Sequence, residues 1–252
     1  MKRLLILGGT GDAIALADKA TKIPKLETIS SLAGRTQNPI APIGNVRIGG
    51  FGGEDGLTAY LQDNHIDLLI DATHPFAAQI SAHAATATAT CGIPHLILVR
   101  PPWQKQTGDR WIEVESHTAA AQALSEFAGN SPKRVFLTIG RQELAAFADL
   151  DSIWFLMRAI DPPAANVKVP HGKLHLKRGP FTLESERSLL IEYQIDAIVS
   201  KNSGGDATCA KIVAARELGI PVVIIQRPPI PSVEQVDSVD TAIAWLMEQL
   251  VQ

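Results

Sequence analysis

Two segments of this chain combine polar side chains with proline or glycine in a way that suits chemistry on a ligand. The motif DATHPF (residues 71–76) offers the hydroxyl of Thr73 and the imidazole of His74. His74 could donate a hydrogen bond to a substrate, relay a proton or simply cap a helix, with Pro75 as the first helical residue. The motif KNSGG (residues 201–205) combines a cation with accessible backbone amides, which suits carboxylates or phosphates. We predict Thr73 and His74 as catalytic residues.

The predicted anion site extends beyond the KNSGG motif. Arg141 follows another predicted strand, and the helix expected after KNSGG carries two more candidates. For Lys173 and Lys177, which also lie in this half of the chain, a solvated surface charge is the favoured interpretation. The predicted substrate-binding residues are Arg141, Lys201, Asn202, Ser203, Gly204, Gly205, Thr208 and Lys211.

A glycine turn near the start of the chain suggests a nucleotide site. LILGGTGDAIALA (5–17) has the pattern of a strand, a turn and a helix, and Gly8, Gly9 and Gly11 would let backbone amides approach a phosphate. The spacing differs from G-x-G-x-x-G, so a merely structural turn is the alternative. The neighbouring Thr10 completes this part of the predicted site.

The segments after the next two predicted strands extend the nucleotide site. In SLAGRT (31–36), Arg35 stands where an acidic residue would hold the ribose of NAD, and it could bind a 2′-phosphate instead. This favours NADPH, with NADH as the alternative; an exposed loop arginine is the structural interpretation. GGFGG (49–53) could let a cofactor lie against the backbone or could be a flexible turn. The predicted cofactor-binding residues are Gly8, Gly9, Thr10, Gly11, Ser31, Gly34, Arg35, Thr36, Gly50 and Gly52.

Short apolar runs bounded by Gly, Pro or Asn predict the strands that position these segments. We expect strands over 3–7, 26–30, 46–48, 67–71, 95–99, 111–115, 134–139, 153–158, 174–177, 196–200 and 221–225. Helices fill the gaps, including 182–193, 206–218 and 238–250. Continuous runs such as LLIL and LLID predict strands buried on both faces of a mainly parallel α/β sheet. In such folds, ligands bind beyond the carboxyl ends of the strands.

An internal repeat predicts two domains. GIPHLILVRPP (92–102) returns as GIPVVIIQRPP (219–229), and similar strands and helices precede and follow each copy. We therefore expect two similar doubly wound, Rossmann-like α/β domains, 1–130 and 131–252, with the boundary near Gly129-Asn130-Ser131-Pro132 and a ligand cleft between them. An exchange of strands between the halves would blur that boundary.

Composition excludes several classes of function. A net charge of −3 gives no bulk basic field for nucleic acid. The predicted first strand leaves no room for a signal peptide, and no apolar run approaches the ~20 residues of a membrane span. The two cysteines form no Cys-x-x-Cys and are expected to be free thiols in a reducing cytosol. We expect a cytoplasmic protein, monomeric or a small homo-oligomer.

Several catalytic motifs are absent from the sequence. Neither tyrosine begins the Tyr-x-x-x-Lys of short-chain dehydrogenases, and neither G-x-x-x-x-G-K-[ST] nor G-x-S-x-G occurs. The histidines show no metal-ligand spacing with a third partner, so we predict no metal site.

Taken in order over the full length, the motifs resemble those of a known family. GGTGDA, SLAGRT, GGFGG, DATHPFA, the Gly-Arg pair at 140–141, KNSGG with TCAKIVAAR, and GIPVVIIQRPP are similar to the precorrin-6A and cobalt-precorrin-6A reductases of corrin (vitamin B12) biosynthesis. The resemblance implies an oxidoreductase that acts on a CH–CH group, transferring a hydride from NAD(P)H to the conjugated macrocycle to give the dihydro 6B form.

The resemblance also implies the ligand of the predicted anion site. The substrate would be a tetrapyrrole-derived polycarboxylate, whose acetate and propionate groups suit Lys201, Ser203, Gly204 and Arg141, while Thr73 and His74 would border the hydride path. His74 is the candidate proton donor, with water or the substrate as alternatives. Two other functions stay open at this point: a non-catalytic NADP-sensing or ligand-binding protein, and a reductase of another polyanionic conjugated substrate.

Overall fold

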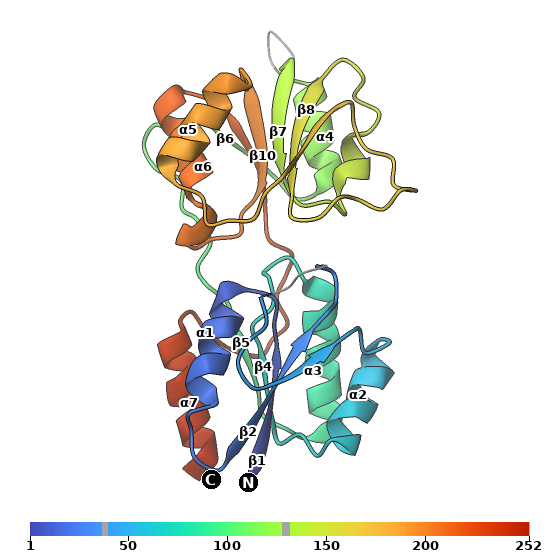
Figure 1. Cartoon of the computed structure of the whole chain (residues 1–252), viewed down its shortest axis with the longest axis vertical. Coiled ribbons are helices and arrows are strands. Elements are labelled where there is room, and N and C mark those ends of the chain that lie inside the picture. The colour runs from blue at the N-terminus through green and yellow to red at the C-terminus, as the bar shows by residue number, and fades with distance from the viewer. Residues whose placement is uncertain (37–39, 128–131, 252) are drawn as a thin grey trace. The chain divides into compact units, whose positions relative to one another are not determined.

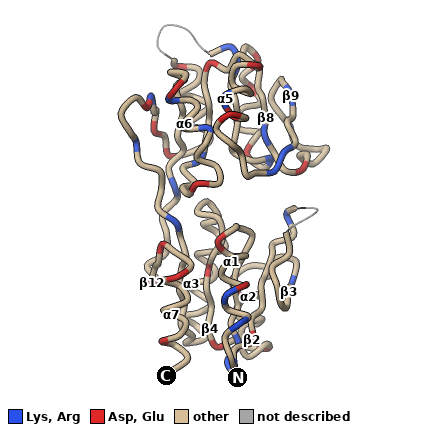
Figure 2. The backbone as a smooth tube through the Cα atoms, turned by 60° about the vertical axis from the view of Figure 1, so that its left-hand side comes forward, with Lys and Arg blue, Asp and Glu red and all other residues tan. Residues whose placement is uncertain are grey.

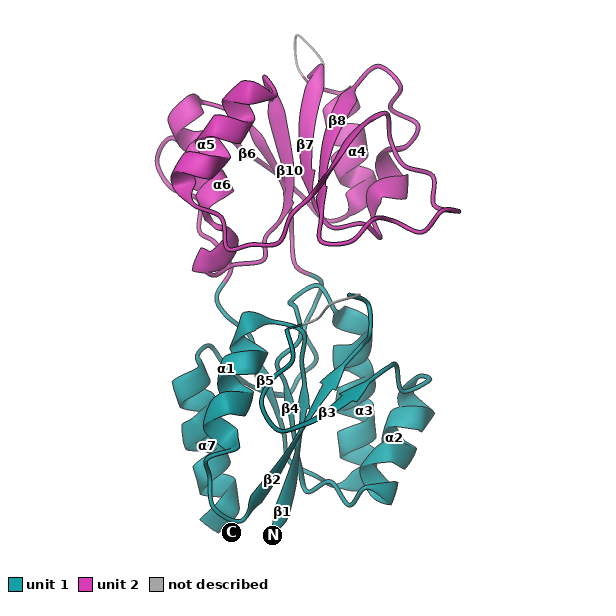
Figure 3. Cartoon of the chain, in the orientation of Figure 1, with its two compact units in different colours: residues 1–101, 228–252 teal, residues 102–227 magenta. Residues whose placement is uncertain are grey.

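The computed structural model describes residues 1–36, 40–127 and 132–251. The chain forms two compact units, unit 1 from residues 1–101 and 228–252 and unit 2 from residues 102–227 (Figure 3). Each unit contains one six-stranded sheet, and all the strand pairings of the described residues are parallel. The predicted α/β fold with two similar domains is confirmed.

Unit 1 has the strand order β12-β5-β4-β1-β2-β3. Its helices α1 and α7 lie against one face of the sheet and α2 and α3 against the other (Figure 1), each pair covering a separate apolar core. The strands are β1 (Lys2–Leu7), β2 (Leu26–Leu32), β3 (Asn45–Ile48), β4 (Leu68–Asp71), β5 (His95–Leu98) and β12 (Glu234–Val236). The helices are α1 (Gly11–Ala20), α2 (Glu54–Asp63), α3 (Ala78–Cys91) and α7 (Val239–Val251).

Unit 2 repeats this arrangement with the order β6-β11-β10-β7-β8-β9. Its strands are β6 (Trp111–Val114), β7 (Arg134–Thr138), β8 (Trp154–Ala159), β9 (Gly172–Leu176), β10 (Ala197–Lys201) and β11 (Val222–Ile225). Its helices are α4 (His117–Ser125), α5 (Leu183–Glu192) and α6 (Ala210–Leu218), with the short 3₁₀ helices η1 (Leu144–Phe147) and η2 (Asp206–Thr208). The buried β11 and the buried central residues of β7 and β10 account for the continuous apolar runs seen in the sequence.

The two halves of the repeat exchange their last strands. β6 and α4 follow β5 in sequence, yet β6 pairs with β11 in unit 2, while β12 from the chain's end pairs with β5 in unit 1. The compact units therefore differ from the predicted domains 1–130 and 131–252, whose boundary at residues 130 and 131 lies outside the described residues. Such an exchange costs little because the exchanged elements are alike.

Two further expectations concern the whole chain. Among the described residues, no helix is both long and apolar enough to cross a membrane. Lys and Arg are interspersed with Asp and Glu along the described parts of both units (Figure 2), consistent with the small net charge of −3.

Candidate functional site

The glycine turn of unit 1 lies where the strand order changes direction. β1 has β2 on one side and β4 on the other, and ligands of doubly wound sheets bind at such a point. Thr10 is the N-cap of α1: its hydroxyl accepts a hydrogen bond from the Ala13 N–H at 3.1 Å and donates to the Ala72 carbonyl at 2.7 Å. Apart from the adjoining backbone, no atom of the described residues lies within 4 Å of the position that a Cβ would take at Gly9 or Gly11. The backbone at the start of α1 is therefore accessible to a ligand, whereas the Thr10 side chain already forms hydrogen bonds within the protein.

The predicted cofactor residues beyond β2 and β3 are connected by a residue that sequence reasoning missed. Arg47, on β3, donates to the Ser31 hydroxyl at 3.0 Å and to the carbonyls of Gly49 at 2.8 Å and Gly50 at 3.0 Å. The Ser31 carbonyl in turn accepts from the Gly8 N–H at 2.9 Å. Arg47 thus joins the GGFGG turn to β2, whose Ser31 carbonyl binds the glycine turn.

The remaining cofactor candidates lie at the same edge of the sheet. Gly34 and Arg35 are exposed just after β2, Thr36 is half-buried, and Gly34 and Gly52 both have positive φ, of 71° and 85°. Because β1, β2 and β3 are parallel neighbours, everything that follows their carboxyl ends meets at one edge. The structure therefore brings the ten predicted cofactor residues to one edge of one sheet.

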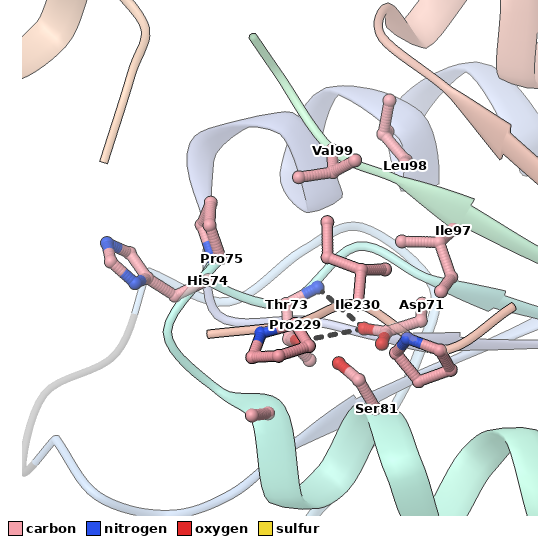
Figure 4. Close-up of a pocket in the computed structure, with 12 residues that line it drawn as sticks. Asp71, Thr73, His74, Pro75, Ser81, Ile97, Leu98, Val99, Pro229 and Ile230 are labelled. Carbon is pink, nitrogen blue, oxygen red and sulfur yellow. Dashed lines mark hydrogen bonds between the residues drawn. The ribbon is translucent and has the colours of Figure 1, made fainter. Parts of the chain in front are cut away.

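A pocket opens beyond β4 and β5, and it includes both predicted catalytic residues. Its polar lining comprises Asp71, Thr73, His74 and Ser81, and its apolar wall includes Ile97–Val99 and Pro229–Pro231 (Figure 4). Ligand sites commonly combine apolar walls with a few convergent polar groups. The second copy of Arg-Pro-Pro contributes to this wall only because β12 belongs to unit 1.

Asp71 is the most buried polar group of this pocket. Asp71 is 1% exposed. Its Oδ1 accepts hydrogen bonds from the Thr73 N–H at 3.0 Å and from the Thr73 hydroxyl at 2.7 Å. Its Oδ2 has no hydrogen-bond partner among the described residues. Buried carboxylate oxygens are normally paired, so Oδ2 is a candidate acceptor for an N–H or O–H of a ligand.

His74 occupies the rim of this pocket. Its imidazole extends away from the Asp71–Thr73 pair (Figure 4), and its Nδ1 accepts from the Phe76 N–H at 3.2 Å, so Nε2 is the atom that can hold a proton. We expected Pro75 to be the first helical residue, and this prediction is wrong. Residues 74–77 form a turn closed by a hydrogen bond from the Ala77 N–H to the His74 carbonyl at 2.7 Å, and α3 begins at Ala78.

The KNSGG motif starts at Lys201, the last residue of β10, and continues as a tight loop. Gly204 and Gly205 have φ of 66° and 72°, and the chain then enters η2. The α-helix α6 begins only at Ala210, so the helix N-terminus that we expected directly after KNSGG is a single 3₁₀ turn instead. Positive φ at both glycines turns the chain before regular helix can start.

The structure divides the predicted substrate residues into two sets. Asn202 and Lys211 are 3% and 5% exposed, and Lys211 Nζ donates to the Thr208 carbonyl at 2.7 Å. We therefore move these two side chains from the ligand-binding set to the support of the loop. Lys201, Ser203, Gly205 and Thr208 stay half-buried, Gly204 is buried, and Arg141, which donates to the Pro162 carbonyl at 2.7 Å, is half-buried.

Comparison with known proteins identifies the family of the chain. Residues 3–247 match the family model described as "Precorrin-6x reductase CbiJ/CobK". The chain belongs to the precorrin-6A reductase family. It is 51% identical over 247 residues to the precorrin-6A reductase of Rhodococcus erythropolis, covering 98% of each chain, and 48% identical to that of Mycobacterium tuberculosis (strain ATCC 25618 / H37Rv), again covering 98% of each. A solved structure, "CobK precorrin-6A reductase", shares 41% identity and a TM-score of 0.91, covering 99% of this chain and 97% of that one.

The family resemblance inferred from the motifs is thus confirmed. The chain is an oxidoreductase that acts in cobalamin biosynthesis, and its substrate is a tetrapyrrole. The described residues contain no group of three or more His, Cys, Asp or Glu side chains that could hold a metal ion.

A histidine of the reductase that sequence reasoning set aside lies next to the predicted anion site. His117 begins α4, and its Nδ1 is 3.7 Å from Glu143 Oε2. Burial lowers the pKa of His117, the charge of Lys201 lowers it further, and Glu143 raises it. No spacing in the sequence signals this group, because α4 follows the first repeat and reaches Lys201 only through the exchange of β6.

The buried Lys211 of the reductase predicts an unusual dependence of stability on pH. Burial lowers the pKa of Lys211 from 10.5 to about 7, against the opposing charge of Glu186 and with a further lowering by Arg158. Between these two pKa values the folded state holds fewer protons than the unfolded state. The free energy of unfolding should therefore rise with pH across this range, by up to about 1.4 kcal/mol per pH unit.

Lys211→Met should lack this rise. The measurement is the free energy of unfolding of both proteins at pH 7, 8 and 9, since all other titrating groups are common to both. Parallel curves for the two proteins would contradict the lowered pKa.

Proposed function

We propose that the chain reduces precorrin-6A to its dihydro 6B form with NADPH as the hydride donor. The observation that carries the choice of a dinucleotide is the coincidence of the glycine turn with the point of reversal in the order β3-β2-β1-β4-β5-β12. This is the strand order in which dinucleotides bind across the carboxyl ends of the strands.

The residues of unit 1 fit such a cofactor. The open positions at Gly9 and Gly11 admit a phosphate to the start of α1, and the exposed Arg35 suits a 2′-phosphate. The apolar wall of the Asp71 pocket suits a flat ring, and Asp71 Oδ2 suits a carboxamide N–H. When bound, the reduced nicotinamide supplies the hydride, which the family resemblance directs to C19 of the macrocycle.

The residues of the pocket rim have distinct tasks in this proposal. The Thr73 hydroxyl donates to Asp71, which holds the carboxylate in place and leaves the hydroxyl oxygen able to accept from a ligand. His74 keeps a proton on Nε2 because its Nδ1 accepts from the backbone, so the neutral imidazole can donate a hydrogen bond to the substrate. The proton that follows hydride addition then comes from water or from the substrate itself.

Unit 2 provides the partners for the carboxylates of the macrocycle. Lys201 and Arg141 supply charge, and Ser203, Gly204, Gly205 and Thr208 supply hydroxyl and amide groups around the same loop. The metal-free macrocycle is the favoured substrate, since relatives named precorrin-6A reductase are 42–51% identical to the chain. A relative named cobalt-precorrin-6A reductase, from Priestia megaterium, is 30% identical.

An anaerobic assay tests the proposal. Precorrin-6A or its cobalt form is incubated with NADPH or NADH, and the nicotinamide absorbance and macrocycle spectrum are followed together. We expect the fastest turnover with precorrin-6A and NADPH. Tight NADPH binding without turnover of either macrocycle would overturn the proposal in favour of a binding protein.

Lys201→Ala tests the substrate side separately. The KM for precorrin-6A should rise about tenfold, the scale of a lost charged hydrogen bond, while the melting temperature stays close to that of the parent protein. Lys133→Ala is the matched control, because Lys133 is an exposed lysine that precedes β7, at the opposite edge of the same sheet. A large fall in melting temperature with an unchanged KM would assign Lys201 a structural role.

A further inference from the structure

We propose that Trp103 and Arg227 are positioning residues that set the direction of the backbone amides in loop 201–205. The inference rests on the proposed function, in which this loop binds carboxylates of the macrocycle. It concerns two side chains that touch the loop from outside, and neither belongs to the KNSGG motif.

Trp103 holds the loop through its backbone and through its ring. Its N–H donates to Asn202 Oδ1 at 2.8 Å, and its carbonyl accepts from Asn202 Nδ2 at 3.2 Å. Both polar atoms of the buried Asn202 side chain are therefore paired with the Trp103 backbone. The Trp103 indole Nε1 donates to the Gly205 carbonyl at 2.9 Å. The ring is supported by Lys211, whose Nζ lies 4.7 Å from the ring centre.

Arg227 binds the carbonyls of Asn202 and Ser203, which lie in the chain between the two Trp103 contacts at Asn202 and Gly205. Its Nε donates to the Asn202 carbonyl at 2.8 Å, and its Nη2 donates to the Ser203 carbonyl at 2.9 Å. A planar guanidinium with two donors in fixed directions can orient two successive peptide groups, which a lysine cannot do.

These contacts determine where the amides of the loop point. In a trans peptide the N–H and the C=O lie on opposite sides of the chain. Arg227, by binding the Ser203 carbonyl, therefore directs the Gly204 N–H away from itself, and Trp103, by binding the Gly205 carbonyl, does the same for the Asp206 N–H. The Ser203 N–H is already used on the Lys201 carbonyl at 2.8 Å. The direction of the next amides thus depends on the two side chains.

Both residues lie at an Arg-Pro-Pro segment of the repeat. Trp103 follows Arg100-Pro101-Pro102, and Arg227 opens Arg227-Pro228-Pro229, so both lie where the chain enters or leaves unit 2. In unit 1 the corresponding Arg100 binds Asp12 at 2.9 Å, next to the glycine turn. Each repeat arginine therefore binds a segment at the carboxyl edge of its own sheet, the first turn of α1 for Arg100 and the 201–205 loop for Arg227.

The test uses Trp103→Phe and Arg227→Lys in the full-length protein. Trp103→Phe keeps an aromatic ring but removes the donor to the Gly205 carbonyl, and Arg227→Lys keeps the charge but cannot orient two carbonyls. Each should weaken binding of precorrin-6A about fivefold, measured by absorbance titration without cofactor, while the Kd for NADPH stays unchanged. Hydrogen exchange of the 201–209 amides should become faster in both.

Arg110→Lys is the matched control, because Arg110 also donates to a carbonyl in unit 2, that of Gly219 at 2.9 Å, before the start of β6 and β11. It should leave the precorrin-6A Kd unchanged. Faster exchange in the loop with an unchanged precorrin-6A Kd would overturn the positioning role and leave the proposed function intact. Failure of the parent protein to bind precorrin-6A would overturn the proposed function and this inference with it.

Discussion

Replacing Arg35 by alanine should weaken NADPH binding by about 1.5–3 kcal/mol and leave NADH binding almost unchanged. Arg35 is exposed just after β2, where a doubly wound sheet meets the adenosine ribose of a dinucleotide. A guanidinium there forms charge-assisted hydrogen bonds with a 2′-phosphate, a group that NADH lacks. The measurement is the Kd of each dinucleotide by fluorescence titration, with the folded state checked by thermal unfolding.

Asp71→Asn provides the contrasting variant for this experiment. The amide keeps an acceptor for the Thr73 N–H and hydroxyl but replaces the unpaired Oδ2 by a donor. Because the nicotinamide half is common to both dinucleotides, this change should weaken NADPH and NADH to the same extent. Equal losses of both dinucleotides in Arg35→Ala would remove the role of Arg35 in binding the 2′-phosphate.

Glu186→Gln should destabilise the protein by about 3–5 kcal/mol, the largest change in folding stability that we expect from a single substitution. Glu186 is 1% exposed and binds Arg158 through both oxygens, at 3.0 Å and 2.7 Å. The Arg158 guanidinium also lies 3.9 Å from the centre of the Phe181 ring. Removal of the carboxylate leaves a buried cation without its counter-charge, which costs more than the lost hydrogen bond alone.

Chemical denaturation of three variants separates this explanation from others. Glu192→Gln removes an exposed carboxylate from the end of the same helix α5 and should change stability little. Arg158→Met combined with Glu186→Leu removes both charges and should recover most of the loss. A double variant no more stable than Glu186→Gln would show that the hydrogen-bond geometry, and not the uncompensated charge, determines the cost.

Much of the candidate site could be predicted because its residues follow buried strands. The predicted strand 67–71 appears as β4, so the DATHPF motif had to lie at its carboxyl end, and the same reasoning placed Arg35 after β2. Prediction was less successful for the side chains that support these segments. Arg47 binds the Ser31 hydroxyl of the neighbouring strand, and Trp103 and Arg227 bind backbone carbonyls of a distant loop. No spacing in the sequence encodes such contacts.

The functions of individual polar residues within a motif also depended on the structure. Lys201 and Lys211 look equally suited to an anion in the sequence, yet Lys211 lies under the Trp103 ring with its pKa lowered by burial. Helical periodicity predicts that a residue is on one side of a helix, whereas the neighbours that bury it come from other elements.

The sequence by itself determined the fold class, the order of strands and helices, the edges at which the polar motifs lie, and the family. These follow from local patterns: apolar runs of strand length, glycine turns and motifs in a fixed order. Only the tertiary structure decided which sheet receives β6 and which receives β12. Both copies of the repeat end in a similar apolar strand and Arg-Pro-Pro, so each short strand that follows could complete either sheet. Where two segments are so alike, local sequence contains no preference, and the choice depends on packing between segments far apart in the chain.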